Sequence, residues 1–375
     1  MIYKFKEIVL EDKIVKDAFI EIKDGKFGKL LENYEGEYED YSSYTMAPGY
    51  VDTHIHGFGG HDIMDCDKEG FFKICEGIVK NGVTSYLPTT LTSSVEILND
   101  ACKNVGDNYK EAKGAKVRGI FLEGPFFTEA HKGAQNPKYF SDPDIEKLKK
   151  WKDLSDGLVN KIAIAAERDG VEDFIKEARK LGVYVAIGHS DAQYEDAYKA
   201  VMAGANIFVH TYNGMSGLHH RTPGVVGTAL STDDTYCELI CDGHHVHPAA
   251  ARVVIKAKDY DHVVLITDCM MAGGLEEGMY KLGEFDVKVE GGTARLESGS
   301  LAGSILKLNK AVENVYDWKI ASKFEAIQMA SLIPAKSVGI DDVCGKIAEG
   351  YDADFNILND DLTLVATFID GEKVA

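Results

Sequence analysis

The sequence predicts an α/β fold in which a (β/α)8 TIM-like barrel carries a small β-sandwich formed by both ends of the chain. Between residues 47 and 344, short apolar runs alternate with segments of helical periodicity, as in parallel strands joined by helices. Residues 1–46 and 345–375 contain only strand-like runs and turns. Each end alone is too short to bury a core, so we expect the two ends to form one small domain around a separate barrel domain.

The terminal domain is predicted from strand-like runs on both sides of the barrel. In the N-terminal segment these runs lie at 3–9, 14–22 and 27–31. Asp24-Gly25 separates the last two runs and is typical of a tight hairpin turn. The acidic, tyrosine-rich residues 32–44 are expected to form a connection or an exposed edge. Near the C-terminus, further strand-like runs lie at 345–347, 354–358 and 364–369.

The barrel is predicted from eight apolar runs in the central segment. They lie at 50–51, 83–88, 117–122, 162–165, 183–187, 207–209, 238–241 and 263–266. Apolar residues at helical spacing cover 171–181 and 194–201, and a longer helical stretch is expected over 304–336. Eight strands with helical or loop intervals favour a closed barrel over an open sheet.

Side chains suited to metal binding or acid–base chemistry follow these apolar runs. They are His54, His56, Glu123, His189, His210, His245 and Asp268. The carboxyl ends of all strands of a (β/α)8 barrel meet at one face, so these side chains should converge there. His54 and His56 are two residues apart in an extended segment and therefore point the same way. A single histidine at a strand end is ordinarily structural, but so many at one face predict a metal site.

The residue types in this set suit metal-assisted hydrolysis. Four histidines and Glu123 can hold one or two divalent metals and leave positions for water and substrate. A divalent metal lowers the pKa of water into the neutral range. Asp268 can take a proton from that water and return it to a leaving nitrogen, and His245 can stabilise the oxyanion of a tetrahedral intermediate. These residues therefore predict hydrolysis of an amide-like bond.

Length, charge and cysteine content limit the remaining possibilities. The chain has 375 residues, of which 45% are hydrophobic, and this is enough for a full core. The formal net charge of −20 argues against nucleic acid and anionic membranes as partners, although local cationic groups still permit a small anionic substrate. The seven cysteines form no C-x-x-C motif and suit a reducing cytosol. The charged N-terminus reads as neither a signal peptide nor a membrane span, so we expect a cytoplasmic protein.

Several motifs resemble the amidohydrolase superfamily. The His54-x-His56 strand end, the later strand-end histidines and Asp268 on the last strand are similar to its metal-site pattern, and residues 345–354 are similar to its return into the terminal β-domain. Within the superfamily, the chain resembles the N-acetylglucosamine-6-phosphate deacetylase family. The blocks that carry this resemblance are Leu122-Glu123-Gly124-Pro125-Phe126, Gly188-His189-Ser190, His210-Thr211-Tyr212-Asn213-Gly214-Met215, Asp242-Gly243-His244-His245 and Leu301-Ala302-Gly303-Ser304.

The resemblance implies a divalent metal cofactor, with one or two ions per subunit. Glu123, His189 and His210 match the family's principal metal ligands. His54 and His56 match a second metal site that some members possess. Zinc is the expected metal, and iron, manganese, cobalt and nickel are alternatives because imidazole and carboxylate accept them as well.

The resemblance also implies a phosphosugar substrate, N-acetylglucosamine 6-phosphate, that is hydrolysed to glucosamine 6-phosphate and acetate in amino-sugar metabolism. Asp268 matches the catalytic acid/base and His245 a residue beside the acetyl group. The other matched substrate positions are Ala134, Gln135, Asn213, Gly214, Arg221, Leu301, Ala302 and Gly303. Gln135 departs from the family pattern, because many members have histidine there. Arg221 matches an arginine that reaches the neighbouring subunit's site, which implies a homodimer.

Plainer explanations exist for some of these residues when the resemblance is set aside. Asn213-Gly214 is a turn signal, and an arginine such as Arg221 is usually a solvated surface residue. Two other functions stay open: another amidohydrolase, such as a different deacetylase, a deaminase or a cyclic amidase, and an inactive structural barrel. The fourth predicted strand has no lysine at its end, which counts against a lysine-bridged deaminase or cyclic amidase. Retention of every ligand counts against the structural role.

Overall fold

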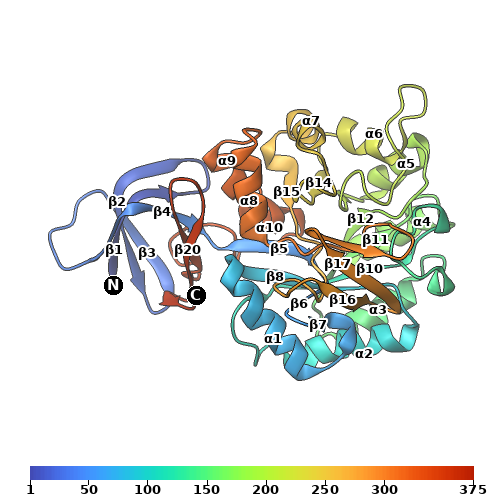
Figure 1. Cartoon of the computed structure of the whole chain (residues 1–375), viewed down its shortest axis with the longest axis horizontal. Coiled ribbons are helices and arrows are strands. Elements are labelled where there is room, and N and C mark those ends of the chain that lie inside the picture. The colour runs from blue at the N-terminus through green and yellow to red at the C-terminus, as the bar shows by residue number, and fades with distance from the viewer.

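The larger part of the molecule is a parallel eight-stranded barrel, as the sequence predicts (Figure 1). The structure is a computed structural model that describes residues 1–375. The barrel strands are β5 (Tyr50–Ile55), β8 (Val83–Thr90), β10 (Ile120–Phe126), β11 (Val159–Ile164), β12 (Tyr184–Ile187), β13 (Ile207–Phe208), β14 (Tyr236–Leu239) and β15 (Val263–Leu265). Neighbours along the chain are neighbours in the sheet, apart from the short strand β9 (Lys116–Val117), which pairs with β8 outside this order.

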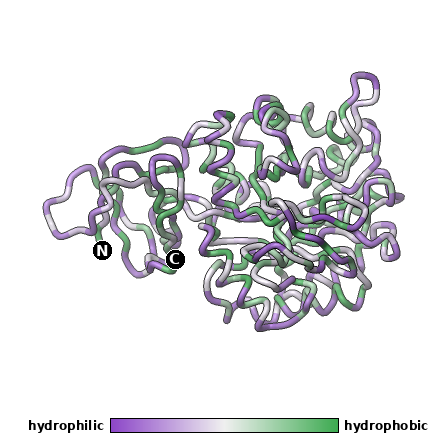
Figure 2. The backbone as a smooth tube through the Cα atoms, in the orientation of Figure 1, coloured by the Kyte–Doolittle hydropathy of each residue, from purple (hydrophilic) through white to green (hydrophobic).

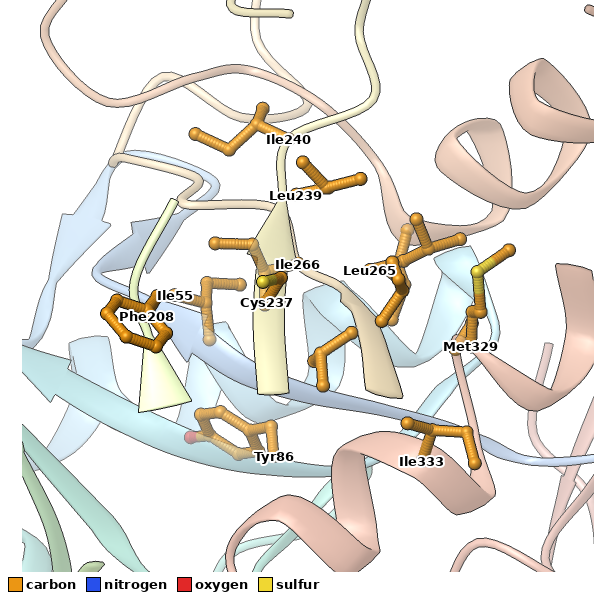
Figure 3. Close-up of a cluster of buried hydrophobic side chains, with 14 of the residues drawn as sticks. Ile55, Tyr86, Phe208, Cys237, Leu239, Ile240, Leu265, Ile266, Met329 and Ile333 are labelled. Carbon is orange, nitrogen blue, oxygen red and sulfur yellow. The ribbon is translucent and has the colours of Figure 1, made fainter. Parts of the chain in front are cut away.

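The barrel closes between its first and last strands by two different means. At the carboxyl end, Asp268 N–H donates to the His54 carbonyl at 2.8 Å, and His56 N–H donates to the Cys269 carbonyl at 2.9 Å. At the other end, the Met329 carbonyl accepts from Leu265 N–H at 2.8 Å, so a later segment of chain completes the seam there. Figure 3 shows Met329 beside Leu265 within the surrounding apolar cluster.

Helices pack around the barrel, and most of them bury one apolar face. They are α1 (Lys68–Ile78), α2 (Val95–Asn108), α3 (Ile145–Leu154), α4 (Val171–Lys180), α5 (Tyr194–Ala203), α6 (Gly224–Ser231), α7 (Pro248–Lys258), α8 (Leu308–Asp317), α9 (Lys323–Gln328) and α10 (Leu332–Ser337). In α4, for example, Val171, Phe174 and Ala178 are buried at helical spacing, whereas α6 and α10 are buried on nearly all sides. The stretch expected to be helical over 304–336 is divided into three helices, and Ser322 with Glu325 forms a capping box at the start of α9.

The interior of the barrel is filled by side chains from successive strands. Val51, Leu87, Phe121 and Ala163 belong to one buried cluster, which also includes Ala335 of α10. The barrel is therefore a packed core and not a pore, and its functional groups lie above this layer at the carboxyl ends of the strands.

Both ends of the chain contribute to one seven-stranded mixed sheet, drawn at the left of Figure 1 with both termini. Its order is β21 (Glu372–Lys373), β20 (Leu364–Ile369), β19 (Phe355–Leu358), β4 (Glu39–Pro48), β1 (Ile2–Val9), β2 (Ile14–Lys23) and β3 (Lys26–Leu31). Phe27 of β3 and Phe355 of β19 lie 6.1 Å apart between ring centroids, although three strands separate them in the sheet. The sheet therefore curls around a single apolar core, which gives the predicted sandwich-like packing from one continuous sheet.

Residues 32–44 match the expected connection only in their first half, which joins β3 to β4. Their second half is the start of β4, which lies near the middle of the sheet between β1 and β19. The exposed residues Glu39 and Asp40 pair with β1, and the buried part of β4 begins only at Thr45. The mostly exposed, acidic first half of the strand explains why its composition suggests a loop. Because β4 runs through Pro48, the division at residues 46 and 47 stays a prediction.

Three short strands form a meander that the sequence analysis does not anticipate. They are β16 (Gly278–Leu282), β17 (Phe285–Glu290) and β18 (Thr293–Leu296), and they follow the last barrel strand. Leu282, Val287 and Val289 are buried in a small cluster with residues of neighbouring loops, such as Leu91 and Met270. A two-stranded ribbon, β6 (Gly57–Phe58) with β7 (His61–Asp62), follows the first barrel strand. In Figure 2, hydrophobic segments run through the barrel while outer loops are hydrophilic. No helix combines the length and apolar character needed to cross a bilayer.

Candidate metal centre

The predicted ligands converge at the carboxyl end of the barrel and are all buried. His54 is in β5, Glu123 is in β10, and the others lie just beyond the ends of their strands. Two groups form: Glu123, His189 and His210 in one, and His54, His56 and Asp268 in the other. Within each group the ligand atoms lie within 4.8 Å of one another, so each group could hold one metal ion.

The carboxylate of Glu123 lies between the two groups. Its Oε1 atom is 3.3 Å from His189 Nε2 and 3.2 Å from His210 Nε2. The same carboxylate is 3.4 Å from His54 Nε2 and 3.3 Å from His56 Nε2. Asp268 Oδ1 lies 3.2 Å from His56 Nε2 on the other side. The arrangement is that of two adjacent ion positions with one carboxylate able to bridge them.

Three of the four imidazoles are held at Nδ1 by a protein acceptor. His189 Nδ1 is 2.9 Å from the His131 carbonyl, and His210 Nδ1 is 3.0 Å from the Asn213 carbonyl. His54 Nδ1 is 3.0 Å from a carboxylate oxygen of Glu238. An acceptor at Nδ1 fixes the tautomer and leaves the Nε2 lone pair free toward the centre, as metal ligation requires.

Electrostatics at the centre favours a positive charge. Burial disfavours protonation of His54, but Asp268 and Glu123 outweigh it and raise the pKa of this imidazole to about 9. The same carboxylates raise the pKa of His56 well above its usual value against the effect of burial. Conversely, burial would raise the pKa of Glu123, yet the surrounding histidines hold it well below its ordinary range. A metal ion can replace these protons, because neutral imidazole and ionised carboxylate are the ligating forms.

The donor set fits a divalent metal on geometric grounds as well. His54 Nε2 is buried and has no hydrogen-bond partner, although it faces Glu123 Oε1 at 3.4 Å and Asp268 Oδ1 at 3.5 Å. A lone pair directed at two carboxylates is unfavourable without a cation between them. Imidazole with carboxylate suits zinc, iron, manganese, cobalt and nickel.

The backbone at three of these positions is in the left-handed region, which non-glycine residues rarely occupy. His189 has φ 46°, His210 has φ 31° and Asp268 has φ 49°. Each such conformation costs of order 1 kcal/mol or more and persists only where the surroundings impose it. The sharp turns aim the side chains inward directly after the strands end.

A cavity of about 250 Å³ opens onto the metal centre. It exposes Glu123, His56 and Asp268 together with His245. The predicted substrate positions that line it are Ala134, Gln135, Asn213, Gly214, Leu301 and Gly303. Its wall also includes Leu282, so the unanticipated β16–β18 meander contributes one side of the cavity.

Two predicted substrate residues lie outside this cavity. Ala302 is buried next to its lining and does not line it. Arg221 is exposed on the loop before α6, and its guanidinium contacts the neighbouring His220 ring at 2.7 Å. Gln135 lines the cavity, but its amide already donates to Glu123 at 2.5 Å and accepts from Thr92 N–H at 3.0 Å.

His245 has a charged partner that the motif alone did not identify. Its Nδ1 atom is 2.7 Å from Asp242 Oδ2, and Asp242 Oδ1 accepts two backbone N–H groups at 2.8 Å. Burial raises the pKa of Asp242, but His245 outweighs it and the net pKa is lowered. Asp242 is thus an ionised acceptor that orients the imidazole toward the cavity.

Other supporting residues lie inside the barrel strands, and the sequence analysis did not single them out. Lys161 in β11 and Glu238 in β14 are fully buried and form an ion pair beneath His54. Asp52 in β5 is also fully buried and accepts from the Thr267 hydroxyl at 2.6 Å, which ties the first strand to the last. Burial raises the pKa of Asp52 to about 6. Charged residues within apolar strands are the one signal that could have identified these positions.

The chain is similar to known deacetylases over nearly its whole length. A model of the amidohydrolase family matches residues 45–374. An N-acetylglucosamine-6-phosphate deacetylase of Vibrio furnissii is 36% identical over 364 residues, 96% of this chain and 91% of the relative. An N-acetylgalactosamine-6-phosphate deacetylase of Escherichia coli O157:H7 is 36% identical over 372 residues, 99% and 98% of the two chains. Among solved structures, the chain is similar to a mutant N-acetyl-D-glucosamine-6-phosphate deacetylase of Mycobacterium smegmatis in complex with N-acetyl-D-glucosamine-6-phosphate. The TM-score is 0.95 at 27% identity, and the match covers 100% of this chain and 99% of that one.

Proposed function

The chain belongs to the amidohydrolase family, and from this premise we propose that it deacetylates an N-acetylhexosamine 6-phosphate. The proposed substrate is N-acetylglucosamine 6-phosphate, and the products are glucosamine 6-phosphate and acetate. One observation carries the proposal: both buried ligand groups, the second of which includes Asp268, lie beside one cavity. His245 lines the same cavity. That combination supplies an ion site, an acid–base group and an oxyanion donor next to one another.

Glu123, His189 and His210 are proposed to hold the principal ion, and His54 and His56 with Asp268 to hold a second one. Zinc is the proposed metal in both positions, with iron, manganese, cobalt or nickel as alternatives. A divalent metal at this centre supplies Lewis-acid polarisation of the acetyl carbonyl and lowers the pKa of the attacking water.

Asp268 and His245 are proposed to move protons and stabilise charge. Asp268 accepts a proton from the attacking water and delivers it to the departing sugar nitrogen, so that one carboxylate acts first as base and then as acid. Asp242 accepts from His245 Nδ1 and orients the ring toward the cavity, where His245 is proposed to stabilise the oxyanion of the acetyl group.

The phosphate is proposed to bind at the Asn213-Gly214 turn and at an arginine from a second subunit. Asn213 and Gly214 line the cavity, whereas Arg221 does not contribute to the cavity of its own chain. An arginine on an exposed loop can reach a neighbouring site only in an oligomer, which supports the proposed homodimer. Arginine suits this task because its planar fork matches phosphate oxygens.

A second candidate substrate is N-acetylgalactosamine 6-phosphate. A relative named for that activity is as similar in sequence as one named for the N-acetylglucosamine activity. The two sugars differ only in the configuration of one hydroxyl, which the cavity could accommodate through a change in one hydrogen bond.

Acetate release from the two phosphosugars tests the proposal directly. We expect the metal-loaded protein to hydrolyse N-acetylglucosamine 6-phosphate with the higher kcat/KM. We also expect the unphosphorylated sugar to be hydrolysed about 100-fold less efficiently, because binding energy from the phosphate is lost. A preference for the galactosamine epimer would select the second candidate. No acetate from either phosphosugar after zinc, iron or cobalt addition would refute the proposed activity.

A further inference from the structure

A buried ion pair supports the second metal position from inside the barrel. Lys161 in β11 and Glu238 in β14 are both fully buried, and the Lys161 ammonium donates directly to Glu238 Oε1. Lys161 also donates to the Thr53 carbonyl at 3.2 Å. The other carboxylate oxygen of Glu238 lies 3.0 Å from His54 Nδ1. The pair therefore lies behind His54, on the side of the ring that faces away from the metal position.

In the neutral form of His54, which is the form that ligates a metal, Glu238 determines which ring nitrogen carries the proton. An ionised carboxylate can only accept hydrogen bonds, so His54 Nδ1 must be the donor in this contact. The Nε2 lone pair is then directed at the space between Glu123 and Asp268, where it has no partner in the protein. Lys161 in turn supplies the counter-charge without which a buried carboxylate is strongly disfavoured.

Packing leaves the His54 ring little freedom to compensate for loss of this contact. The Phe121 ring meets the His54 ring edge to face at 4.8 Å between centroids. The Lys161 ammonium lies 3.8 Å from the centre of the same Phe121 ring. His56 is held differently, because its Nδ1 is buried without any hydrogen-bond partner. Of the two histidines in the second group, His54 alone has a charged anchor.

We propose that Lys161 and Glu238 are positioning residues that fix the ring and tautomer of His54 for the second metal ion. The pair thereby sets the affinity of the second ion independently of the Glu123, His189 and His210 position. This inference rests on the proposed function in one respect: it assumes that His54, His56 and Asp268 bind a divalent ion.

The test compares two double variants that differ only in the acceptor facing His54 Nδ1. In K161M/E238L the ion pair is replaced by apolar side chains of similar size, which avoids an unpaired buried charge. In K161M/E238Q the amide oxygen restores an uncharged acceptor. Both variants lose the Lys161 contact to the Thr53 carbonyl, so that loss cancels in the comparison. The measurement is stepwise Zn²⁺ binding to metal-stripped protein in competition with a chromogenic chelator, without substrate.

We expect wild-type protein to bind two Zn²⁺ ions, and K161M/E238L to bind the second one about 10- to 100-fold more weakly, as is usual when the partner of a ligating histidine is removed. The first step should not change, and K161M/E238Q should recover most of the second. H54A should lose the second step entirely. A matched control is K323M/E7L, which removes the mostly buried pair at 2.7 Å between Lys323 of α9 and Glu7 of β1 in the terminal sheet, and should leave both steps intact.

Several results would overturn the inference. They are a single Zn²⁺ ion in wild-type protein, both steps unchanged in K161M/E238L, equal weakening in the leucine and glutamine variants, or equal weakening of both ions. If K161M/E238L does not fold, E238D replaces it: the charge opposite Lys161 stays but the carboxylate retracts from Nδ1. The second step should again weaken, and wild-type affinity would refute the role. Acetate release is assayed separately, so loss of the proposed activity and loss of this positioning role are distinguishable.

Discussion

The four clustered imidazoles are not equivalent residues. His189 and His210 are anchored at Nδ1 by backbone carbonyls of nearby loops, whereas His54 is anchored by a buried carboxylate. His56 has no anchor at Nδ1. Because the anchor fixes the tautomer, we expect the ion held by His189 and His210 to bind more tightly than the one held by His54 and His56.

Replacement of Asp268 separates proton transfer from binding of the principal ion, although Asp268 also belongs to the second ligand group. D268N keeps the size of the side chain but removes its ability to accept a proton. We expect turnover to fall by about 10³-fold, within the range for loss of a general acid–base group, while the fold and the principal ion remain. Acetate release, metal content and thermal unfolding would check this. Hydrolysis at a near wild-type rate would show that another group transfers the proton.

Removal of both His54 and His56 should affect one ion only. In H54A/H56A the second position loses both imidazoles and keeps only Asp268 and the shared Glu123 carboxylate, while the group of Glu123, His189 and His210 is untouched. We expect metal content to drop from two ions to one and part of the activity to remain. Elemental analysis of the protein gives the count. Loss of both ions would mean that the two positions form only together.

In the loops that follow the strands, the backbone as well as the ligand side chains lies close to the centre. Gly214 has φ +60°, and a Cβ atom there would lie 2.9 Å from His189 Nδ1. We expect G214A to displace the His189 ring from the His131 carbonyl, to weaken the principal ion and to lower turnover at least about 10-fold, in addition to about 1 kcal/mol of backbone strain. Zn²⁺ competition and acetate release measure both effects.

The matched control for this loop is G157A. Gly157 has φ +81°, but a Cβ atom added there would meet no other heavy atom within 4 Å. The variant should show the cost in stability of a left-handed alanine without any change in metal affinity. Equal metal affinity in G214A and G157A would contradict a steric role for Gly214 at the centre.

At the level of elements, the barrel strands and their polar ends were predictable because their apolar runs are continuous and end in ligand-type residues. The β16–β18 meander was not anticipated, although β17 alternates buried Val287 and Val289 with exposed residues. A search for alternating strands and helices does not detect a half-exposed β-ribbon of this kind.

The start of β4 has the composition of a loop because exposed acidic residues pair there through the backbone alone. The ion pair between Lys161 and Glu238 joins two residues that are 77 positions apart in the sequence. A pattern within a short stretch of sequence cannot reveal such a pair.

For the whole molecule, polar contacts connect the terminal sheet to the barrel. Lys116 of β9 lies 2.9 Å from Asp352, 3.0 Å from Asp354 and 2.6 Å from Asp370. Arg118 lies 3.1 Å from Asp352. These aspartates flank the C-terminal strands β19 and β20, so the contacts hold the returning end of the chain against β9, which pairs with the second barrel strand. Association of the two parts therefore depends in part on charge.

The pH dependence of stability should reveal this contribution. Burial would raise the pKa of Asp352, but Lys26, Lys116 and Arg118 outweigh it and hold the pKa well below its ordinary value. A depressed carboxyl pKa adds stability above the unfolded-state pKa of about 4, and this stability is lost as the pH falls through the folded-state value. We expect D352N to lower the free energy of unfolding by about 1–2 kcal/mol at pH 7, after allowance for partial solvent screening.

Urea unfolding of wild type and D352N at several pH values would measure this difference. The gap between their midpoints should be largest at neutral pH and should narrow below about pH 4, because the carboxyl of Asp352 then binds a proton in the unfolded chain but not in the folded protein. D156N is the matched control: Asp156 also pairs with a lysine, Lys110 at 2.8 Å, but both side chains are more than half exposed. Solvent screens such a pair, so its removal should leave the midpoint unchanged. A D352N gap that stays constant from pH 7 to pH 3 would mean that Asp352 stabilises the junction by packing and not by charge.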